Sequence, residues 1–274
     1  MKSKELRDFY DNLKIASDPL VDIEEYRKSN MAYIHIQQFF RERVFLGVFD
    51  NQAGSSFGSP YTITCVIEDP LHITDTLKFE FSQEENTIAA AHYDPPNTIF
   101  LYANLKADTE DKLFENLYEA VVENGQAIIH EYTHHIDMNR MKDTQGYLGY
   151  LDRLEEQLYN SNDFKSFFNN TYWNLPHETN AYLVEGMGKI YQDIFVKLRT
   201  IESRLVGGTH LNSLRKIFYS FDSFTDELNR YIHPQFMMFT SEENDKKIRK
   251  RLYKFYTFMH DIVSANLSRF NLAL

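Results

Sequence analysis

Apolar and polar residues alternate in the first half of the chain as they do in half-buried strands. Four stretches are predicted as strands on this basis: Tyr61–Ile67, Ile73–Phe81, Thr87–His92 and Thr98–Leu105. Between the last two lies Asp94-Pro95-Pro96-Asn97, whose residue types are typical of a turn between antiparallel strands. The pattern therefore predicts a small antiparallel sheet within residues 61–105.

Beyond residue 105 the apolar positions recur with the period of an α-helix. Asp108 can cap a first helix, whose opening turn holds Glu110 and Asp111 beside the positive end of the helix dipole. This helix can extend to about Met141, with Gly125 as a weak point or a break. The same period recurs at residues 147–160, 163–172, 176–204, 211–230 and 242–268, and near the N-terminus at Lys4–Ala16.

Glycine and proline residues divide these elements. Asn51–Pro60 is rich in Gly and Ser and predicts a loop. Gly207-Gly208 is expected to end the long helix that starts near residue 176, and His233-Pro234 to end or break the next one. The stretch Met31–Phe49 is apolar, but its pattern does not favour one type of structure.

The balance of charge limits the classes of partner. The chain of 274 residues has 40 acidic residues against 29 Lys and Arg, a formal net charge of -11. A general nucleic-acid binder needs a basic surface to neutralise phosphates, so no nucleic-acid partner is expected. The basic cluster of Lys246, Lys247, Arg249, Lys250 and Arg251 is expected to be the solvated face of a helix.

Other features of the sequence favour a soluble, cytoplasmic protein without membrane contact. Cys65 is the single cysteine, so no intramolecular disulfide is possible, and its apolar neighbours predict a buried side chain. The first 20 residues lack the apolar stretch of a signal peptide. No window approaches the roughly 18 apolar residues that a membrane span requires. The sequence does not indicate an oligomeric state.

The residues that suggest chemistry are His130-Glu131-Tyr132-Thr133-His134. The two histidines are four positions apart, so on a helix they share a face and can bind one tetrahedral Zn²⁺ at about 2.0–2.1 Å. Glu131 lies beside the pair, within reach of a water molecule on the metal. Zinc lowers the pKa of such a water to about 7, and Glu131 can accept its proton as the water attacks a carbonyl group.

This motif and its setting resemble the catalytic core of the zincins, metallopeptidases with a His-Glu-x-x-His helix. The resemblance covers about residues 87–185 and implies that Thr98–Leu105 is an edge strand that binds the substrate backbone. It also implies a third protein ligand. In metzincins that ligand is a His beyond a Gly three residues after the second His, but Asp137 occupies this place here and no suitable His follows.

In gluzincins a Glu from a later helix completes the ligand set, and Leu175–Tyr182 resembles that element. Pro176 can open the helix, and Glu178 with Ala181 gives the Glu-x-x-Ala spacing of several such families. The resemblance thus implies a metal site formed by His130, His134 and Glu178. Many gluzincins have an Asp four residues after the ligand Glu, where this chain has Tyr182, so the residue that orients Glu178 is left open.

Other residues near the motif remain alternatives. His177 adjoins Glu178 and could bind the metal if the helix were rotated, although a His beside a Pro is more often a capping or surface residue. Asp137 and Glu185 share the faces of the predicted ligands and either orient them through hydrogen bonds or are ordinary surface acids. His135 points about 100° away from His134, so we do not expect it at the metal.

Hydrolysis of an amide also needs a donor for the oxyanion that forms, and in gluzincin-like enzymes this donor is a Tyr or a His. The candidates by residue type are Tyr172, Tyr182, His210, Tyr231 and His233. The sequence does not rank them.

These observations predict an α+β fold, with a small antiparallel sheet followed by an active-site helix and a mainly helical C-terminal half. The expected segments are an N-terminal helical or irregular part at 1–60, a zincin-like catalytic core at 61–205 and a C-terminal helical part at 206–274. The resemblance implies a zinc metallopeptidase acting on a peptide or protein substrate. Two alternatives are a zincin-fold binding or structural protein with a degenerate site, such as a phage virion component, and a zinc hydrolase of non-peptide amides.

Overall fold

The computed structural model describes residues 33–40, 42, 62–83, 90–140, 149, 172–203 and 207–274. The described residues up to 149 belong to one compact unit, and those from 172 onward belong to another. The helix predicted at Lys4–Ala16, the loop at Asn51–Pro60 and almost all of the helices at 147–160 and 163–172 lie outside the described residues. The division of the chain at residues 60 and 205 stays a prediction.

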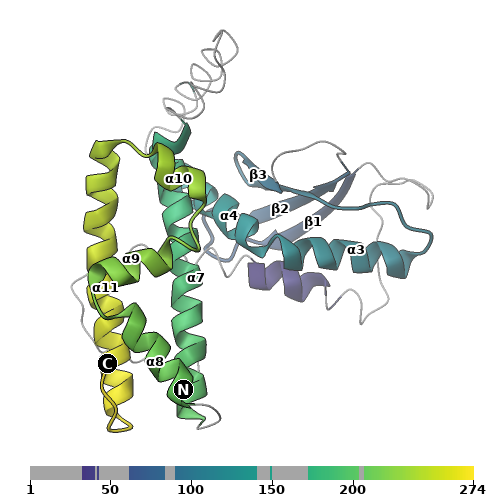
Figure 1. Cartoon of the computed structure of the whole chain (residues 1–274). Helices are drawn as coiled ribbons and strands as arrows, with labels where there is room; N and C mark the ends of the chain where they lie inside the picture. Colours follow the sequence, from purple (N-terminus) through teal and green to yellow (C-terminus); the bar gives the residue numbers. More distant parts are fainter. Residues whose placement is uncertain are drawn as a thin grey trace. The chain divides into compact units, whose positions relative to one another are not determined.

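The first unit contains a four-stranded sheet, three strands of which are labelled in Figure 1. The strand order is β1-β2-β4-β3. Its strands are β1 (Thr62–Glu68), β2 (Thr76–Ser82), β3 (Ala91–Asp94) and β4 (Thr98–Tyr102). β1 pairs with β2, and β3 with β4, in antiparallel orientation, and a turn at residues 95–97 joins β3 to β4 as predicted. β2 and β4 run parallel, however, so the sheet is mixed and not antiparallel throughout.

The parallel pair arises from the way the β3–β4 hairpin joins the sheet. Alternation of apolar residues specifies which face of a strand is buried, but not which strand lies beside it. The hairpin pairs with β2 through its second strand, with Lys78 opposite Thr98 and Ser82 opposite Tyr102. The expectation of an edge strand at Thr98–Leu105 is therefore wrong, because β4 is an interior strand and β3 lies at the edge.

One face of the sheet is buried in the core of this unit. The sheet contributes alternate side chains of β1, β2 and β4: Ile63, Cys65, Ile67, Leu77, Phe79, Phe81, Ile99 and Leu101. Residues 33–40 are helical and add Ile36 and Phe40, whose ring packs edge-on against Phe81. The sequence pattern thus predicted the buried face correctly, including Cys65, which is 2 % exposed.

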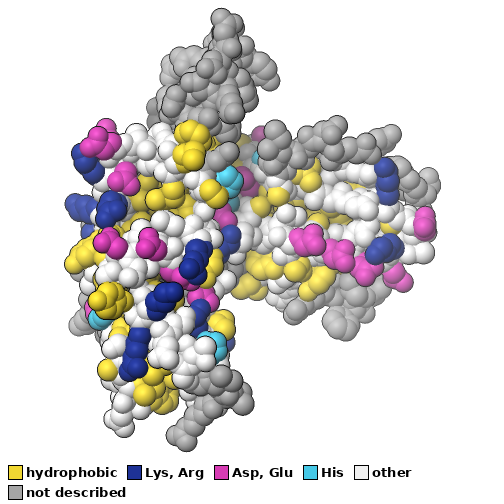
Figure 2. Space-filling model, viewed as in Figure 1, with side chains coloured by type: hydrophobic (Ala, Val, Ile, Leu, Met, Phe, Trp, Pro, Cys, Tyr) yellow, Lys and Arg dark blue, Asp and Glu magenta, His cyan; other side chains and the backbone are white. Residues whose placement is uncertain are grey.

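Helix α3 (Glu110–Glu123) packs its apolar side on this core through Leu113, Leu117 and Val121. Figure 2 shows the opposite side of α3 as a row of acidic side chains. The exposed acids that lie one turn apart along it are Asp111, Glu115, Glu119 and Glu123. The helix is therefore amphipathic in the way that its sequence period predicts.

The cap of α3 differs from the prediction by one residue. Thr109, and not Asp108, has extended backbone angles and precedes the first helical turn. Its hydroxyl accepts the backbone N–H of Lys112 at 3.2 Å, which satisfies one of the free donors at the start of the helix.

Asn124 separates α3 from α4 (Gly125–Arg140). It ends α3 by donating its side-chain amide and its backbone N–H to the carbonyl oxygen of Ala120, at 2.8 and 3.0 Å. The ring of Tyr33 packs on Gly125, where an added Cβ would lie 2.9 Å from the ring. The weak point predicted at Gly125 is thus the boundary between two helices.

The second unit is helical (Figure 1). Its elements are the 3-10 turn η1 (Tyr172–Asn174) and the helices α7 (Pro176–Glu202), α8 (Gly207–Ile217), α9 (Phe221–Leu228), α10 (Pro234–Phe239) and α11 (Glu242–Ser268). All five helices contribute to one apolar core, which includes Leu183, Ile190, Leu214, Phe224, Phe236, Phe255 and Met259. In the described part of the chain, no helix has the length and apolar character that crossing a membrane requires.

The breaks within this unit follow the sequence signals in part. Pro234 opens α10, as the predicted break at His233-Pro234 requires. α7 ends at Glu202, before the predicted end at Gly207-Gly208, and Gly207 instead begins α8. The single helix predicted at 211–230 is two helices, because Ser220 caps α9 by accepting the backbone N–H of Ser223 at 3.0 Å.

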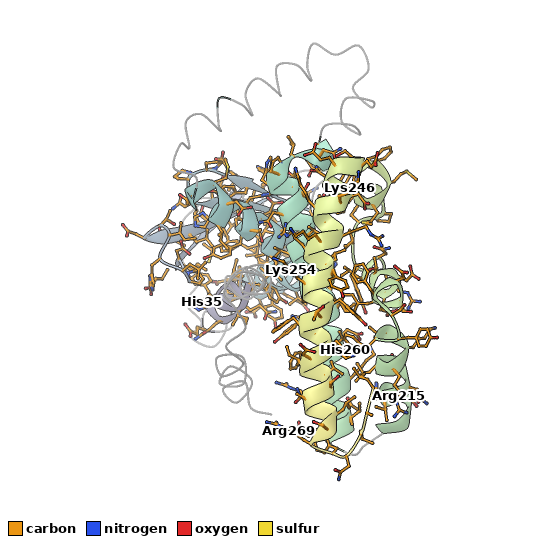
Figure 3. The ribbon with its side chains drawn as sticks, turned by 90° about the vertical axis from the view of Figure 1, so that its left-hand side faces the viewer. His35, Arg215, Lys246, Lys254, His260 and Arg269 are labelled. Atoms are coloured by element: carbon orange, nitrogen blue, oxygen red, sulfur yellow. The ribbon has the colours of Figure 1, made fainter. Side chains whose placement is uncertain are left out.

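The basic cluster of α11 lies on an exposed face of that helix. Figure 3 labels Lys246, which belongs to the cluster, and Lys254, which follows it on the same helix. Lys246 and Lys247 each pair with a Glu one turn earlier, at 3.0 and 2.8 Å. Arg251 differs because it is half-buried and donates to Oδ1 of Asn180 in α7 at 2.8 Å. Burial lowers the pKa of Arg251 to about 10. The predicted solvated face is confirmed except at this residue.

Candidate metal centre

The first part of the candidate site lies on α4. His130 and His134 are one turn apart, and both are buried, with 6 % and 7 % of their surface exposed. Their ring centroids are 4.8 Å apart and the rings are nearly perpendicular, at 86°. The prediction that the two imidazoles share one face of a helix is confirmed. Glu131, between them in sequence, is half-buried.

The opposite side of α4 is held by a buried carboxylate that the sequence analysis did not identify. Asp69 follows β1 and is fully buried, as are Tyr132 and His135. The Tyr132 hydroxyl donates to Oδ1 of Asp69 at 2.5 Å, and Nε2 of His135 lies 3.1 Å from Oδ2. His135 thus points away from the two predicted ligands, as expected from its position on the helix.

The environment of Asp69 keeps its carboxyl ionised. Burial by itself would raise the pKa of Asp69, but the hydrogen bonds from His135, Tyr132 and the backbone N–H groups of Thr74 and Leu71 hold it well below its usual range. For Tyr132 the same contact acts in the opposite direction. Burial and the neighbouring carboxylate raise the pKa of its phenol, so Tyr132 remains a donor.

The edge strand β3 also contacts α4. The Tyr93 hydroxyl lies 3.2 Å from Nδ1 of His135 and donates to the carbonyl oxygen of Pro96 at 2.7 Å. Asn139, one turn after His135, donates its side-chain amide to the same Pro96 oxygen at 3.3 Å. Burial raises the pKa of Tyr93 above its ordinary value. The turn that joins β3 to β4 is therefore fixed to the C-terminal part of α4.

The second part of the candidate site lies at the start of α7. Pro176 occupies the first turn of the helix, as predicted, and Glu178 is buried with 7 % of its surface exposed. Nε2 of His177 is 3.4 Å from one oxygen of Glu178. Burial, and next the negative charge of Glu178, raise the pKa of Tyr172 far above its ordinary value, so the phenol remains protonated beside that carboxylate.

The sequence left open which residue orients Glu178, and Tyr172 lies beside that carboxylate. The hydroxyls of Tyr172 and Tyr182 are 3.5 Å apart. Among the other candidate oxyanion donors, His233 stacks on Trp173 with 5.1 Å between ring centroids. Tyr182 packs on the same indole at 5.1 Å. These two rings therefore have a packing role.

His130, His134 and Glu178 form one group of potential metal ligands. One ligand atom from each residue can be chosen so that all three atoms lie within 4.8 Å of one another, and all three residues are buried. Two imidazoles and one carboxylate are a donor set that zinc accepts, with a fourth position left for water or substrate. The chemistry of the three residues therefore fits a metal ion, although it does not identify the element.

The other residues considered near the motif do not join this group. His177, Asp137 and Glu185 are absent from the one cluster of three or more potential ligands that the described residues form. Glu185 accepts an ion-pair hydrogen bond from Lys189 at 2.9 Å, one turn further along α7. The role of Glu131 and the identity of the ion stay predictions.

Comparison with known proteins adds no assignment: no protein-family model, curated protein or solved structure matches the chain significantly. The likeness to the zincins therefore rests on the motif of α4 and on the buried group of two histidines and one glutamate.

Proposed function

We propose that this chain is a zinc-dependent peptidase whose metal is held by His130, His134 and Glu178. The observation that carries the proposal is the buried approach of these three side chains, with ligand atoms within 4.8 Å. Burial of a carboxylate is costly unless its charge is compensated, and a divalent cation compensates it. The sequence between the two histidines supplies Glu131, an acid at the position that a general base occupies in zincins.

When bound, zinc supplies Lewis-acid chemistry: it lowers the pKa of a water molecule to about 7 and polarises a carbonyl group. Glu131 accepts the proton that the attacking water loses as its oxygen bonds to the carbonyl carbon. The same carboxyl group then gives the proton to the leaving amine as the C–N bond breaks. One water is consumed, and a carboxylic acid and an amine are released.

We propose an extended peptide as the substrate, because the zincins that the motif resembles hydrolyse peptide bonds. In the described residues no strand pairs with the outer edge of β3. β3 contacts α4 through Tyr93 and His135, on the side of the helix that faces away from His130 and His134. A peptide can add to such an edge as another antiparallel or parallel strand.

The test is a cleavage assay on a mixture of denatured proteins, with new chain ends identified by mass spectrometry. We expect cleavage that a chelator abolishes and added zinc restores. The matched variant is Glu131→Gln, which is nearly isosteric and removes no ligand. It should keep its zinc while cleavage falls by about 10²–10⁴-fold.

Three outcomes would contradict the proposal. Cleavage that survives the chelator, or that Glu131→Gln leaves unchanged, would mean that another site or a contaminant is responsible. A parent protein that binds zinc and cleaves no peptide would favour a binding protein with this fold, or a hydrolase of non-peptide amides.

A further inference from the structure

Asp69 accepts hydrogen bonds both from its own loop and from α4. It is fully buried directly after β1. Within its own loop it accepts the backbone N–H groups of Leu71, Ile73 and Thr74, at 3.1, 3.0 and 2.8 Å. These bonds hold the carboxylate in one position in the β1–β2 connection. The two contacts that it makes to α4 therefore fix the helix relative to this connection.

The contacts to α4 involve both carboxylate oxygens and two helical positions. Oδ1 accepts from Tyr132, and Oδ2 faces Nε2 of His135, three positions later on the same side of the helix. The Tyr132 and His135 rings are themselves nearly parallel, with centroids 5.3 Å apart. A helix that is held at two points one turn apart on one side cannot rotate about its axis without breaking at least one of these bonds.

Rotation of α4 is the movement to which a metal site on it is most sensitive. A turn of about 10° moves an atom about 6 Å from the helix axis by about 1 Å. Distances between zinc and its ligands are held to within about 0.2 Å. The same rotation would displace His130, His134 and Glu131 together, because all three project from this helix.

We propose that Asp69 is a positioning residue of the metal centre: through Tyr132 and His135 it sets the rotation of α4 and so the direction of His130, His134 and Glu131. This inference rests on the proposed zinc site. Asp69 touches neither the predicted ligands nor the reacting groups, and it acts through the helix alone.

The experiment compares the full-length parent with Asp69→Asn, Tyr132→Phe and His135→Gln. Each protein is titrated with zinc against a chromophoric chelator, and the visible spectrum of its Co²⁺ form is recorded as a measure of coordination geometry. The unfolding midpoint of the metal-free protein is measured in parallel. Tyr132→Phe removes one hydroxyl from a packed ring and therefore tests the inference even if Asp69→Asn does not fold.

The matched control is Ile63→Ala in β1, which removes core volume from the same unit at a strand that pairs with β2 alone. We expect the three network variants to bind zinc about 10–100-fold more weakly and to show altered Co²⁺ spectra. Ile63→Ala should lower the unfolding midpoint and leave zinc affinity and the Co²⁺ spectrum unchanged.

The result that overturns the inference is a set of network variants that are less stable but retain the zinc affinity and Co²⁺ spectrum of the parent. Asp69 would then be an ordinary structural residue, and the metal centre itself would stand. A parent that binds no zinc would instead contradict the metal centre, and the inference with it.

Discussion

Glu178 and His177 are neighbours in the first turn of α7, yet their positions predict opposite roles. Glu178 groups with His130 and His134, whereas His177 lies 3.4 Å from the carboxylate and outside that group. The pair therefore offers two adjacent substitutions, one of which removes a predicted ligand and one of which removes only its neighbour.

We expect Glu178→Ala to lower zinc affinity by at least about 100-fold, because two remaining protein ligands rarely hold zinc tightly. His177→Ala should lower zinc affinity by less than about 10-fold, because His177 is only a neighbour of the predicted ligand. Loss of a residue that contacts a ligand costs about 10-fold at the lower end of its range. Competition with a chelator of known affinity measures both. Equal losses in the two variants, or a larger loss in His177→Ala, would mean that His177 is the ligand.

What the sequence reveals at this scale depends on distance along the chain. His130 and His134 could be predicted from spacing alone, because four positions on a helix fix their relation. Glu178 required a likeness to known sites, since only the fold brings it to the histidines. Asp69 could not be predicted, because it lies 63 and 66 positions before its partners Tyr132 and His135, and a single Asp after a strand has no distinguishing pattern.

At the scale of elements, two glycines of the helical unit illustrate how packing decides the effect of one methyl group. A Cβ at Gly186 in α7 would lie 2.5 Å from Cγ1 of Ile232, which is buried. Gly208 in α8 is exposed, with nothing within 4 Å of an added Cβ.

Gly186→Ala should therefore destabilise the protein by about 1–3 kcal/mol through overpacking. Gly208→Ala should be neutral or stabilise it by up to about 1 kcal/mol, because Ala restricts the unfolded chain and favours helix. Urea unfolding of both variants measures this difference. A stable Gly186→Ala protein would show that α7 does not approach Ile232 closely.

The loop that holds α4 should make stability depend on pH. The folded pKa of Asp69 lies below its unfolded value of about 3.9, so folding favours the charged carboxylate. Its contribution is complete above the unfolded pKa and is lost as the pH falls toward the folded pKa. The titratable side chains in contact with it are His135 and Tyr132.

We therefore expect the difference in unfolding free energy between the parent and Asp69→Asn to decrease as the pH falls from about 5 toward about 3. The measurement is urea unfolding of the metal-free proteins across this range. A difference that does not change with pH would contradict the charged, hydrogen-bonded carboxylate at position 69.

The positions of the helices and strands along the chain were largely predictable, but the pairing of the strands was not. Alternation identified the buried faces of β1 and β2, and period identified α7 and α11 to within a few residues. The parallel pairing of β2 with β4 depends on which strand of a hairpin meets the sheet, and local pattern does not carry that information. The division of residues 211–230 depends on the Ser220 cap, which the apolar period conceals.

At the scale of the whole molecule, the predicted α+β class is confirmed, with a four-stranded sheet in one unit and helices in the other. We propose that residues from α4 and α7, 44 positions apart at their nearest, complete one metal site. Locating the metal identifies the ligands of such a site directly.

The most direct measurement is a crystal structure of the zinc-loaded protein, with diffraction data collected on both sides of the zinc absorption edge. We predict one anomalous peak per chain, with a nitrogen of His130 and of His134 at about 2.0–2.1 Å and a carboxylate oxygen of Glu178 at about 2.0–2.2 Å. A peak elsewhere, or one bound by His177 or Asp137 in place of Glu178, would contradict this prediction.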